Sequence, residues 1–338
     1  MAKRVPVPGG RYFLVKHLGD GNFGEVWLAD DDHEGDRVAI KFLDPAAAID
    51  SVLAETKVQA RLREHDRVVG IRNVVLGPPR AHIVMDYVPG GSTEKRLEDG
   101  QVTLVEAVRW VRDALDGLAH THSLKILHRD LRPANLLIDA AERAVLSDFG
   151  LAEDTVRNLL ATPAIYVPNA APELVQGGPS SVSTDLWAMG CTLYRLIAGE
   201  SPFDTQQEIL NGSYEPVHYL DPQVPLRLSR VVDKALSVDP AARYATAAEM
   251  RGELIGCGVM HSFDWVDTPG ALECWVADTA QGRVEVKIGE KRGQFEVLVR
   301  LDRGAGLRKR TSHRGLTEAQ ARQRARGHMV HVVQGGVV

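Results

Sequence analysis

The sequence predicts an α+β protein with three parts: a small β-rich lobe, a larger helical lobe and, after them, a small α+β module. Three observations lead to this fold class. Short strand-like runs fill the chain up to Tyr87, amphipathic helical patterns dominate after Gly90, and strand-like alternation returns beyond Gly256. The 338 residues allow two domains of about 100–200 residues each. We therefore divide the chain into an N-terminal tail, a two-lobed domain and a C-terminal module: residues 1–10, 11–256 and 257–338.

Three strands open the two-lobed domain. The runs Arg11–Leu18, Glu25–Asp30 and Arg37–Phe42 are rich in β-forming residues and are separated by Gly and Asp turn signals. A helix is predicted to follow over Ala46–Glu64. The 3.6-residue period places four of its side chains on one face: Val52, Glu55, Gln59 and Leu62.

Helices are predicted for most of the larger lobe. Thr103 and Glu106 form a capping-box pattern at the start of the first, and its apolar stripe contains Val108, Val111, Leu115 and Leu118. Two further helices fit Asp185–Ile197 and Leu226–Leu236. Thr246 and Glu249 form a second capping-box pattern, which opens a helix that ends near Gly256.

The pattern of apolar and polar residues changes again beyond Gly256. Cys274–Ala277, Arg283–Ile288 and Gln294–Leu301 alternate as strands do, and Leu307–Ser312 fits a fourth strand. Thr317 is then the predicted cap of a helix, with Gln320 at the capping-box position. These elements predict a small α+β module over residues 262–334.

The composition limits where the protein can reside and which partners it can have. No run approaches the ~18 consecutive apolar residues of a membrane-spanning helix, and the N-terminus lacks the apolar stretch of a signal peptide. The cysteines, Cys191, Cys257 and Cys274, show no paired or metal-ligand spacing, which is typical of free thiols in a reducing cytoplasm. We expect a cytoplasmic protein without a membrane partner. The oligomeric state stays unknown.

Net charge is −5, but residues 257–338 hold 13 Lys+Arg and 9 Asp+Glu, a balance of +4. The rest of the chain holds 27 basic and 36 acidic residues, a balance of −9. Such asymmetry indicates two modules with different partners.

A glycine-rich segment and a lysine are the first chemical signals. Gly19, Gly21 and Gly24 follow a G-x-G-x-x-G pattern between two predicted strands, where a backbone without Cβ atoms can approach phosphates. Alone, this pattern fits a glycine-rich hairpin equally well. Lys41 lies in an apolar strand 17 residues after Gly24, and Glu55 follows 14 residues later. Because a buried lysine needs a charged partner, we expect a Lys41–Glu55 ion pair.

Two further motifs supply oxygen-rich side chains. In His128-Arg-Asp-Leu-Arg-Pro-Ala-Asn135, Asp130 is placed to accept the proton of a substrate hydroxyl or to orient that hydroxyl. Asn135, five residues after Asp130, and Asp148 of the Asp-Phe-Gly sequence 13 residues later offer hard oxygen ligands for Mg²⁺. An aspartate in a turn is more often structural, but this spacing is very improbable by chance.

The ordered set of motifs resembles the eukaryotic-type (Hanks-type) serine/threonine protein kinases over about residues 11–255. The resemblance continues in Ala171-Pro-Glu173, in Asp185-Leu-Trp-Ala-Met-Gly190 and in Arg243. It implies the two-lobed protein kinase fold and ATP- and Mg²⁺-dependent phosphorylation of protein substrates, including autophosphorylation. It further implies that Glu173 pairs with Arg243 and that Asp185 anchors the catalytic loop.

The same resemblance assigns the site residues. The catalytic set is Asp130, Arg132, Lys41 and Glu55, and the metal ligands are Asn135 and Asp148. ATP is expected to contact the glycine-rich loop, the strands beneath it and the hinge: Gly19, Gly21, Gly24, Val26, Ala39, Lys41, Met85, Asp86 and Val88.

Three positions depart from the family pattern. Arg132 stands where serine/threonine kinases usually have lysine, although Pro133 keeps their pattern, so we favour Ser/Thr over Tyr as acceptor. Gln59 occupies a position that is usually apolar. In the activation segment, Tyr166 occupies the slot of the usual threonine, and Thr162 lies four residues earlier. Thr155 and Thr162 are candidate phosphorylation sites, which Arg129 could pair with.

The C-terminal module carries a run of basic residues: Arg308, Lys309, Arg310, Arg314, Arg322, Arg324 and Arg326. They predict either a polyanion- or nucleic-acid-binding surface or, more commonly for such a run, a solvated face on a docking or dimerisation domain. The module is expected to select substrates or to regulate. Trp265 and Trp275 are expected in its core. Two alternatives to an active protein kinase remain open: a kinase-fold scaffold that binds through this module, and a kinase for a non-protein substrate.

Overall fold

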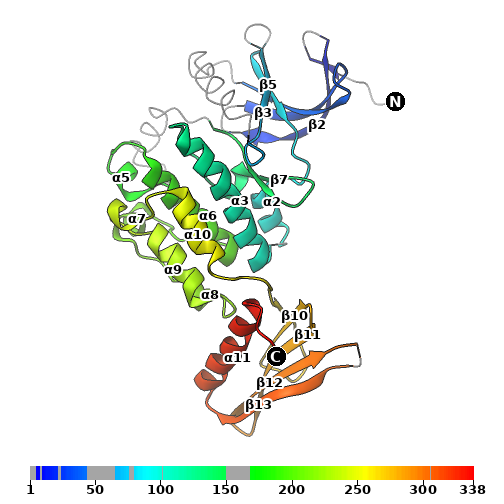
Figure 1. Ribbon diagram of the computed structural model, residues 1–338, viewed down its shortest axis with the longest axis vertical. Helices are drawn as coiled ribbons and strands as arrows, with labels where there is room; N and C mark the ends of the chain where they lie inside the picture. Colours follow the sequence, from blue (N-terminus) through cyan, green and yellow to red (C-terminus); the bar gives the residue numbers. More distant parts are fainter. Residues whose placement is uncertain are drawn as a thin grey trace.

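The computed structural model describes residues 5–7, 10–21, 24–43, 65–75, 80–100, 102–149, 168–304 and 306–338. In these ranges the chain forms three tiers along its long axis: a β-rich lobe, a helical lobe and a C-terminal sheet with one helix (Figure 1). The predicted α+β fold class, with two lobes and an additional small module, is therefore confirmed. The predicted helix over 46–64, with Glu55 and Gln59, lies outside the described residues.

The N-terminal lobe contains a six-stranded sheet in the order β1-β2-β3-β4-β6-β5. Its pairings are all antiparallel. The strands are β1 (Val5–Pro6), β2 (Tyr12–Gly21), β3 (Gly24–Asp31), β4 (Asp36–Phe42), β5 (Ile71–Val75) and β6 (His82–Asp86). The central strand β4 buries consecutive residues from Val38 to Lys41, so both of its faces are covered. Strands β2 and β3 extend beyond their predicted ends into the glycine-rich segment, where Gly21 pairs with Gly24.

The helical lobe is built around α3 (Leu104–Ser123) and α6 (Val182–Ala198). Thr103 and Glu106 form the predicted capping box, while α6 begins three residues earlier than predicted because Ser181 caps it with Thr184. The other helices are α2 (Thr93–Glu98), α5 (Pro172–Val175), α7 (Gln206–Asn211), α8 (Val217–Leu220), α9 (Leu226–Ala235) and α10 (Ala247–Ile255). A short hairpin, β7 (Leu136–Ile138) and β8 (Ala144–Leu146), lies against α3.

The second predicted capping box forms only in part. Thr246 caps α10 by accepting a hydrogen bond from the amide of Glu249. The Glu249 carboxylate accepts from the amide of Ala245, one residue before the cap. The helix start is thus predicted correctly, although the reciprocal bond is displaced by one residue.

The C-terminal module is an antiparallel sheet in the order β13-β12-β11-β10-β9, with helix α11 packed on β11, β12 and β13. Its elements are β9 (Asp264–Trp265), β10 (Glu273–Thr279), β11 (Gly282–Lys291), β12 (Gln294–Asp302), β13 (Arg308–Leu316) and α11 (Glu318–Val333). Thr317 and Gln320 form the predicted capping box. The predicted strands and helix are all present.

The two tryptophans of the module have different environments. Trp275 is buried, as predicted, but the prediction for Trp265 is wrong, because 63% of this residue is exposed. Trp265 lies opposite Trp275 on β9, the edge strand farthest from β13. Helix α11 packs on β11, β12 and β13, so a side chain on this far edge strand lacks the layer that the helix supplies.

The connection between α10 and β9 is bonded to the helical lobe. Gln223 donates to the carbonyl oxygen of Phe263 at 3.1 Å and accepts from its amide at 2.7 Å. Ser262 accepts from the amide of Val105, in the first turn of α3, at 2.9 Å. Phe263 belongs to one continuous apolar core that includes side chains of both the helical lobe and the module. The module is therefore docked on the lobe by its core and by polar contacts.

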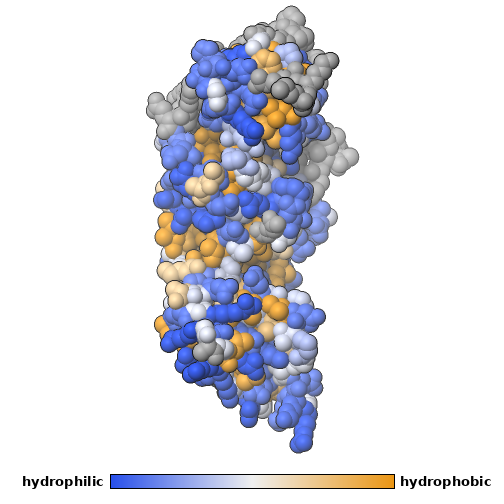
Figure 2. All heavy atoms as spheres, turned by 90° about the vertical axis from the view of Figure 1, so that its right-hand side faces the viewer, coloured by the Kyte–Doolittle hydropathy of each residue, from blue (hydrophilic) through white to orange (hydrophobic). Residues whose placement is uncertain are grey.

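On the face seen in Figure 2, most of the coloured side chains are hydrophilic, and the hydrophobic ones form small groups, some of them near the level where the helical lobe meets the module. Within the described ranges, no helix combines the length and apolar character needed to cross a bilayer. All three cysteines are buried free thiols.

Candidate active site

An ion pair joins the two lobes at the centre of the site. Lys41 Nζ on β4 lies 2.6 Å from Asp148 Oδ1, which follows β8. The lysine side chain is 6% exposed and the aspartate side chain 39% exposed. Asp148 adopts a left-handed backbone conformation with φ of 56°, which is uncommon for a residue with a side chain and recurs at functional sites. The predicted partner Glu55 lies outside the described residues, so the Lys41–Glu55 pair stays a prediction.

Strand register places the predicted ATP contacts of the sheet on one face. Val26 lies opposite Lys41, and Ala39 lies opposite Met85. Lys41 and Ala39 are two residues apart on β4, so their side chains share a face with those of both partners. Since Lys41 reaches Asp148, this face is the one that covers the cleft between the lobes.

Two glycines of the glycine-rich loop differ in the space around them. Gly19 has open space where a Cβ atom would stand. At Gly24, with φ of 137°, a Cβ would lie 1.7 Å from the carbonyl oxygen of Phe42. Gly24 is therefore required by the close approach of β4 itself, in addition to any approach of phosphate.

The hinge between the lobes is fixed by a side chain that the sequence analysis missed. Arg72 on β5 donates to Asp86 Oδ1 at 2.6 Å and to Asp36 at 2.7 and 2.9 Å. The amide of Asp86 donates to the carbonyl oxygen of Gly70. The Asp86 carboxylate is thus occupied within the sheet, and Val88 follows it as a half-buried residue.

One buried carboxylate, that of Asp185, holds the catalytic loop in place. Asp185 on α6 accepts from the amides of His128 and Arg129, both at 2.9 Å, and lies 2.8 Å from His122 Nε2. Arg129 has a left-handed φ of 67°. A bulky residue in this conformation is costly, and the two bonds to Asp185 hold it there. The anchoring role implied for Asp185 matches this geometry.

Asp130 and Asn135 meet at the end of this loop. Asn135 Nδ2 donates to Asp130 Oδ2 at 2.9 Å and to the Asp130 carbonyl oxygen at 2.7 Å. These two hydrogen bonds turn the Asn135 side-chain nitrogen toward Asp130. The side-chain oxygen, Oδ1, therefore points away from Asp130. The sequence predicts both residues, and the structure shows that one orients the other.

The residues expected to hold Mg²⁺ fit a hard cation. The main-chain carbonyl oxygen of Asn135 accepts from the amide of Ser147 at 2.9 Å and from the Ser147 hydroxyl at 3.1 Å. These bonds bring Asn135 beside Ser147, the residue that precedes Asp148. Asn135 Oδ1 and the second Asp148 oxygen are the donors left for a metal, and carboxylate and amide oxygens suit Mg²⁺.

His128 is a buried neutral support for these residues. Its Nδ1 accepts from the amide of Asp130 at 3.4 Å, and its ring packs on Phe149 with centroids 4.3 Å apart. Burial lowers the pKa of His128 below its usual value, even though the charges of Asp185, Asp130 and Asp148 act in the opposite direction.

A second ion pair braces the helical lobe. Arg243 donates to both carboxylate oxygens of Glu173, at 2.7 and 2.8 Å, and its guanidinium lies over the Trp187 ring at 4.8 Å. The Arg243 side chain is fully buried. The bidentate geometry agrees with the pairing that the resemblance implied.

The remaining predicted residues are placed as follows. Arg132 is exposed at the start of a short 3₁₀ turn, Pro133–Asn135. The candidate phosphorylation sites Thr155 and Thr162 lie outside the described residues. Asn169 was missed by the sequence analysis; it donates to the carbonyl oxygen of Leu131 at 2.7 Å and thereby ties the end of the activation segment to the catalytic loop.

Comparison with known proteins identifies this arrangement. Residues 12–253 match the protein kinase domain model. The chain is 34% identical over 275 residues to the serine/threonine-protein kinase PkaB of Streptomyces coelicolor, covering 75% of this chain and 64% of that protein. It is 32% identical over 260 residues to CBL-interacting protein kinase 16 of rice, covering 72% of this chain and 56% of that protein.

A third relative is the probable serine/threonine-protein kinase PknB of Lactococcus lactis, 30% identical over 256 residues, which cover 71% of this chain and 41% of that protein. The chain thus spans less than two thirds of the length of these relatives. The matched domain model covers the two-lobed part, within which the residues just described lie. The chain therefore belongs to the protein kinase family.

Proposed function

We propose that this protein is an ATP- and Mg²⁺-dependent protein kinase that phosphorylates serine or threonine on proteins, itself included. The observation that carries the proposal is the convergence of Lys41, Asp148, Asn135 and Asp130 through two short contacts, 2.6 Å and 2.9 Å long. These side chains come from a strand, a turn and a loop that are up to 107 residues apart. A kinase-fold scaffold without activity would not need all four in place.

The four side chains divide the work of phosphoryl transfer. Lys41 neutralises phosphate charge, and Asn135 and Asp148 hold the metal, which lowers the cost of charge developing on the phosphoryl oxygens. Asp130, oriented by the Asn135 amide, accepts or positions the proton of the substrate hydroxyl. The residues that share a face on β3, β4 and β6 would lie over the nucleotide. Positioning supplies most of the rate, since the protein forms no covalent bond to the phosphoryl group.

Serine or threonine is the proposed acceptor for two reasons. Pro133 keeps the pattern of serine/threonine kinases after Arg132, and the relatives in Streptomyces and Lactococcus carry that activity in their names. Arg132 is exposed and would contact a phosphoryl oxygen as a planar fork rather than as the compact charge of lysine.

The test is phosphorylation of a general protein substrate and of the chain itself with γ-labelled ATP, followed by phosphoamino-acid analysis. We expect labelled phosphoserine or phosphothreonine with wild type, and background labelling with Lys41→Ala. Lys16→Ala, which removes an exposed lysine from β2, is the matched control and should be as active as wild type. Phosphotyrosine as the main product would contradict the proposed acceptor, and full labelling by Lys41→Ala would contradict the proposed site.

A further inference from the structure

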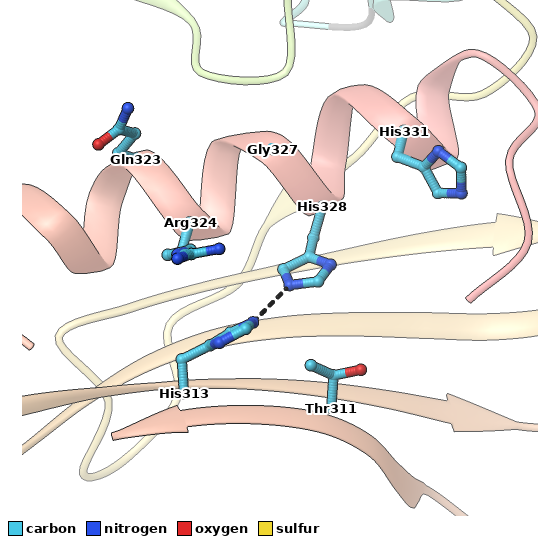
Figure 3. A pocket seen from close by; sticks show the side chains of 7 residues that line it. All are labelled: Thr311, His313, Gln323, Arg324, Gly327, His328 and His331. Atoms are coloured by element: carbon cyan, nitrogen blue, oxygen red, sulfur yellow. Dashed lines mark hydrogen bonds between the residues drawn. The ribbon is translucent and has the colours of Figure 1, made fainter. Parts of the chain in front are cut away.

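A groove in the C-terminal module lies outside the site just described. It has a volume of about 800 Å³ and runs between strand β13 and helix α11 (Figure 3). Thr311 and His313 extend from the strand toward the helix, and Arg324 and His328 extend from the helix toward the strand (Figure 3). This volume falls within the range of about 300–1,000 Å³ that is usual for small ligands or the side chains of a bound peptide.

Strand register explains why these side chains share the groove. His313 lies opposite Val297, and Thr311 lies opposite Val299. Both valines are buried against α11, so their partners on β13 face the helix as well. The pairing of β12 with β13 has two register shifts, and each adds one residue on β13 and bends that strand locally.

The lining is cationic or neutral throughout. Arg324 is exposed and has no ion pair within the described part of the chain, and no carboxylate lines the groove. His313 Nε2 lies 3.2 Å from His328 Nε2, and His331 follows one turn later on α11. Thr311 adds a hydroxyl that can donate to an anion.

A glycine in the helix enlarges the groove. Gly327 lies in the interior of α11, where glycine costs about 1 kcal/mol relative to alanine. Nothing stands within 4 Å of the position that its Cβ would take, so the packing of this chain does not require glycine there. The missing side chain keeps the helix backbone accessible from the groove.

Ion pairs neutralise two members of the basic run. Arg314 is paired with Glu296 at 2.8 Å, and Arg322 is paired with Glu273 at 3.0 Å and with Glu318 at 2.9 Å. A nucleic acid needs cations along successive phosphates, and base stacking needs aromatic rings. The exposed Trp265 lies on β9, at the opposite edge of the sheet. The groove itself holds one arginine, Arg324, beside His313 and His328, which matches a single phosphoryl group better than a row of phosphates.

We propose that the groove between β13 and α11 binds a phosphorylated peptide, with Arg324, His313 and His328 around the phosphoryl group and Thr311 beside it. An arginine such as Arg324 binds a phosphoryl group by paired, charge-assisted hydrogen bonds, and a protonated histidine beside it adds a further donor. The inference rests on the proposed function, because the kinase would generate this ligand. The module would retain a phosphorylated protein on the kinase and so favour its further phosphorylation.

The side chains of the groove are less suited to binding a metal ion than to binding a phosphoryl group. Across the described residues, no group of three or more His, Cys, Asp or Glu side chains is placed to hold a metal ion. His331 is directed to the C-terminal segment, where its Nε2 lies 3.2 Å from the carbonyl oxygen of Val337. Two histidines alone leave a metal with too few protein ligands.

The test uses the full chain and synthetic peptides, so that it does not depend on whether the protein is an active kinase. Fluorescence anisotropy compares a labelled degenerate peptide library with a central phosphothreonine, the same library unphosphorylated, and a labelled oligothymidine. We expect the phosphorylated library to bind at least about tenfold more tightly than the other two, the effect of one or more charge-assisted contacts.

Paired arginine variants then locate the site. Arg324→Gln should weaken binding of the phosphorylated library about tenfold, while Arg322→Gln, the same change two residues away and outside the groove, should alter it less than about twofold. Equal binding of both peptide libraries, no binding, or unchanged affinity in Arg324→Gln would each overturn the proposal. Preferential binding of oligothymidine, weakened in both variants, would replace the phosphopeptide with nucleic acid.

Discussion

The cleft between the lobes and the groove of the C-terminal module have opposite chemistry, although both are proposed to meet a phosphoryl group. The cleft gathers Asp130, Asn135 and Asp148 beside one buried lysine. The groove holds Arg324 and histidines without a carboxylate. Carboxylates meet phosphate only through a metal, and this suits transfer, in which charge must be balanced while bonds change. Arginine and histidine bind phosphate directly, and this suits holding a finished product.

The comparison predicts that the two functions separate by mutation. Asp130→Ala should lower the rate of phosphotransfer by about 10²–10⁴, because the substrate hydroxyl loses its base. The same variant should bind the phosphorylated library as wild type does. Turnover with labelled ATP and anisotropy on one preparation check both parts. If Asp130→Ala keeps near-normal turnover, Asp130 has no catalytic role.

Glycine replacement is the next largest effect in the cleft. Gly24→Ala should destabilise the N-terminal lobe by about 2–4 kcal/mol, since its Cβ would collide with Phe42 and its backbone conformation disfavours a side chain. Urea unfolding measures the change. Gly19→Ala is the control within the same loop: its φ of 159° also disfavours a side chain, but nothing stands within 4 Å of the new Cβ, so the collision is absent and the loss should be smaller. Equal losses in both variants would argue against the contact with β4 as the cause.

The affinity of the groove for the phosphorylated library should depend on pH between 8.0 and 6.5. Burial, together with the charges of His313, His331 and Arg324, lowers the pKa of His328, so His328 is neutral in the free protein above about pH 6.5. A bound phosphoryl group favours the protonated imidazole. Affinity for the phosphorylated library should therefore rise as pH falls from 8.0 to 6.5, by at most about tenfold per pH unit for each proton taken up. His328→Gln should show a flatter profile, and a steeper one would contradict this assignment.

The buried histidine of the catalytic loop responds to pH through stability. The pKa of His128 is lower in the folded chain than in the unfolded chain, so the unfolded state binds more protons below about pH 6.5. The stabilisation is fully present above that pH and declines as pH falls, by at most about 1.4 kcal/mol per pH unit. Unfolding free energies from pH 7.5 to 5.5 should fall more steeply for wild type than for His128→Asn. Parallel slopes would show that His128 protonates without unfolding the loop.

The smallest expected effect belongs to the groove glycine. Gly327→Ala should stabilise the chain by about 0.5–1 kcal/mol, because α11 gains helix propensity and the new methyl group meets no atom. This gain contrasts with the loss expected for Gly24→Ala. Thermal unfolding of the two variants gives the sign of each effect, and a loss of stability in Gly327→Ala would mean that the helix needs glycine there.

Local sequence signals predict much of this fold. Capping pairs such as Thr103 with Glu106 and Thr317 with Gln320 mark helix starts because both partners lie within one turn. Period-two alternation finds β10, β11 and β12. Kinase motifs identify Asp130, Asn135 and Asp148 because their spacing is specific.

Contacts between distant segments were not predictable in this way. The Lys41–Asp148 pair joins residues 107 positions apart, and nothing in either neighbourhood selects the other. Register between β12 and β13 decides that His313 faces His328, and this depends on two irregularities in the pairing. Trp265 was assigned to the core by residue type, whereas its exposure follows from the edge position of β9.

The polar contacts of Gln223 with Phe263 and of Val105 with Ser262 also bear on how such a chain can evolve. An exchanged C-terminal module would have to bring a serine at position 262 and a backbone in the same place at position 263. Otherwise the helix-start amide of Val105 would lose its acceptor, and the buried Gln223 would lose both of its bonds to residue 263. Unpartnered buried groups of this kind cost about 1–3 kcal/mol each. The boundary at which recombination is tolerated therefore lies after Phe263, within the module, rather than at the end of α10.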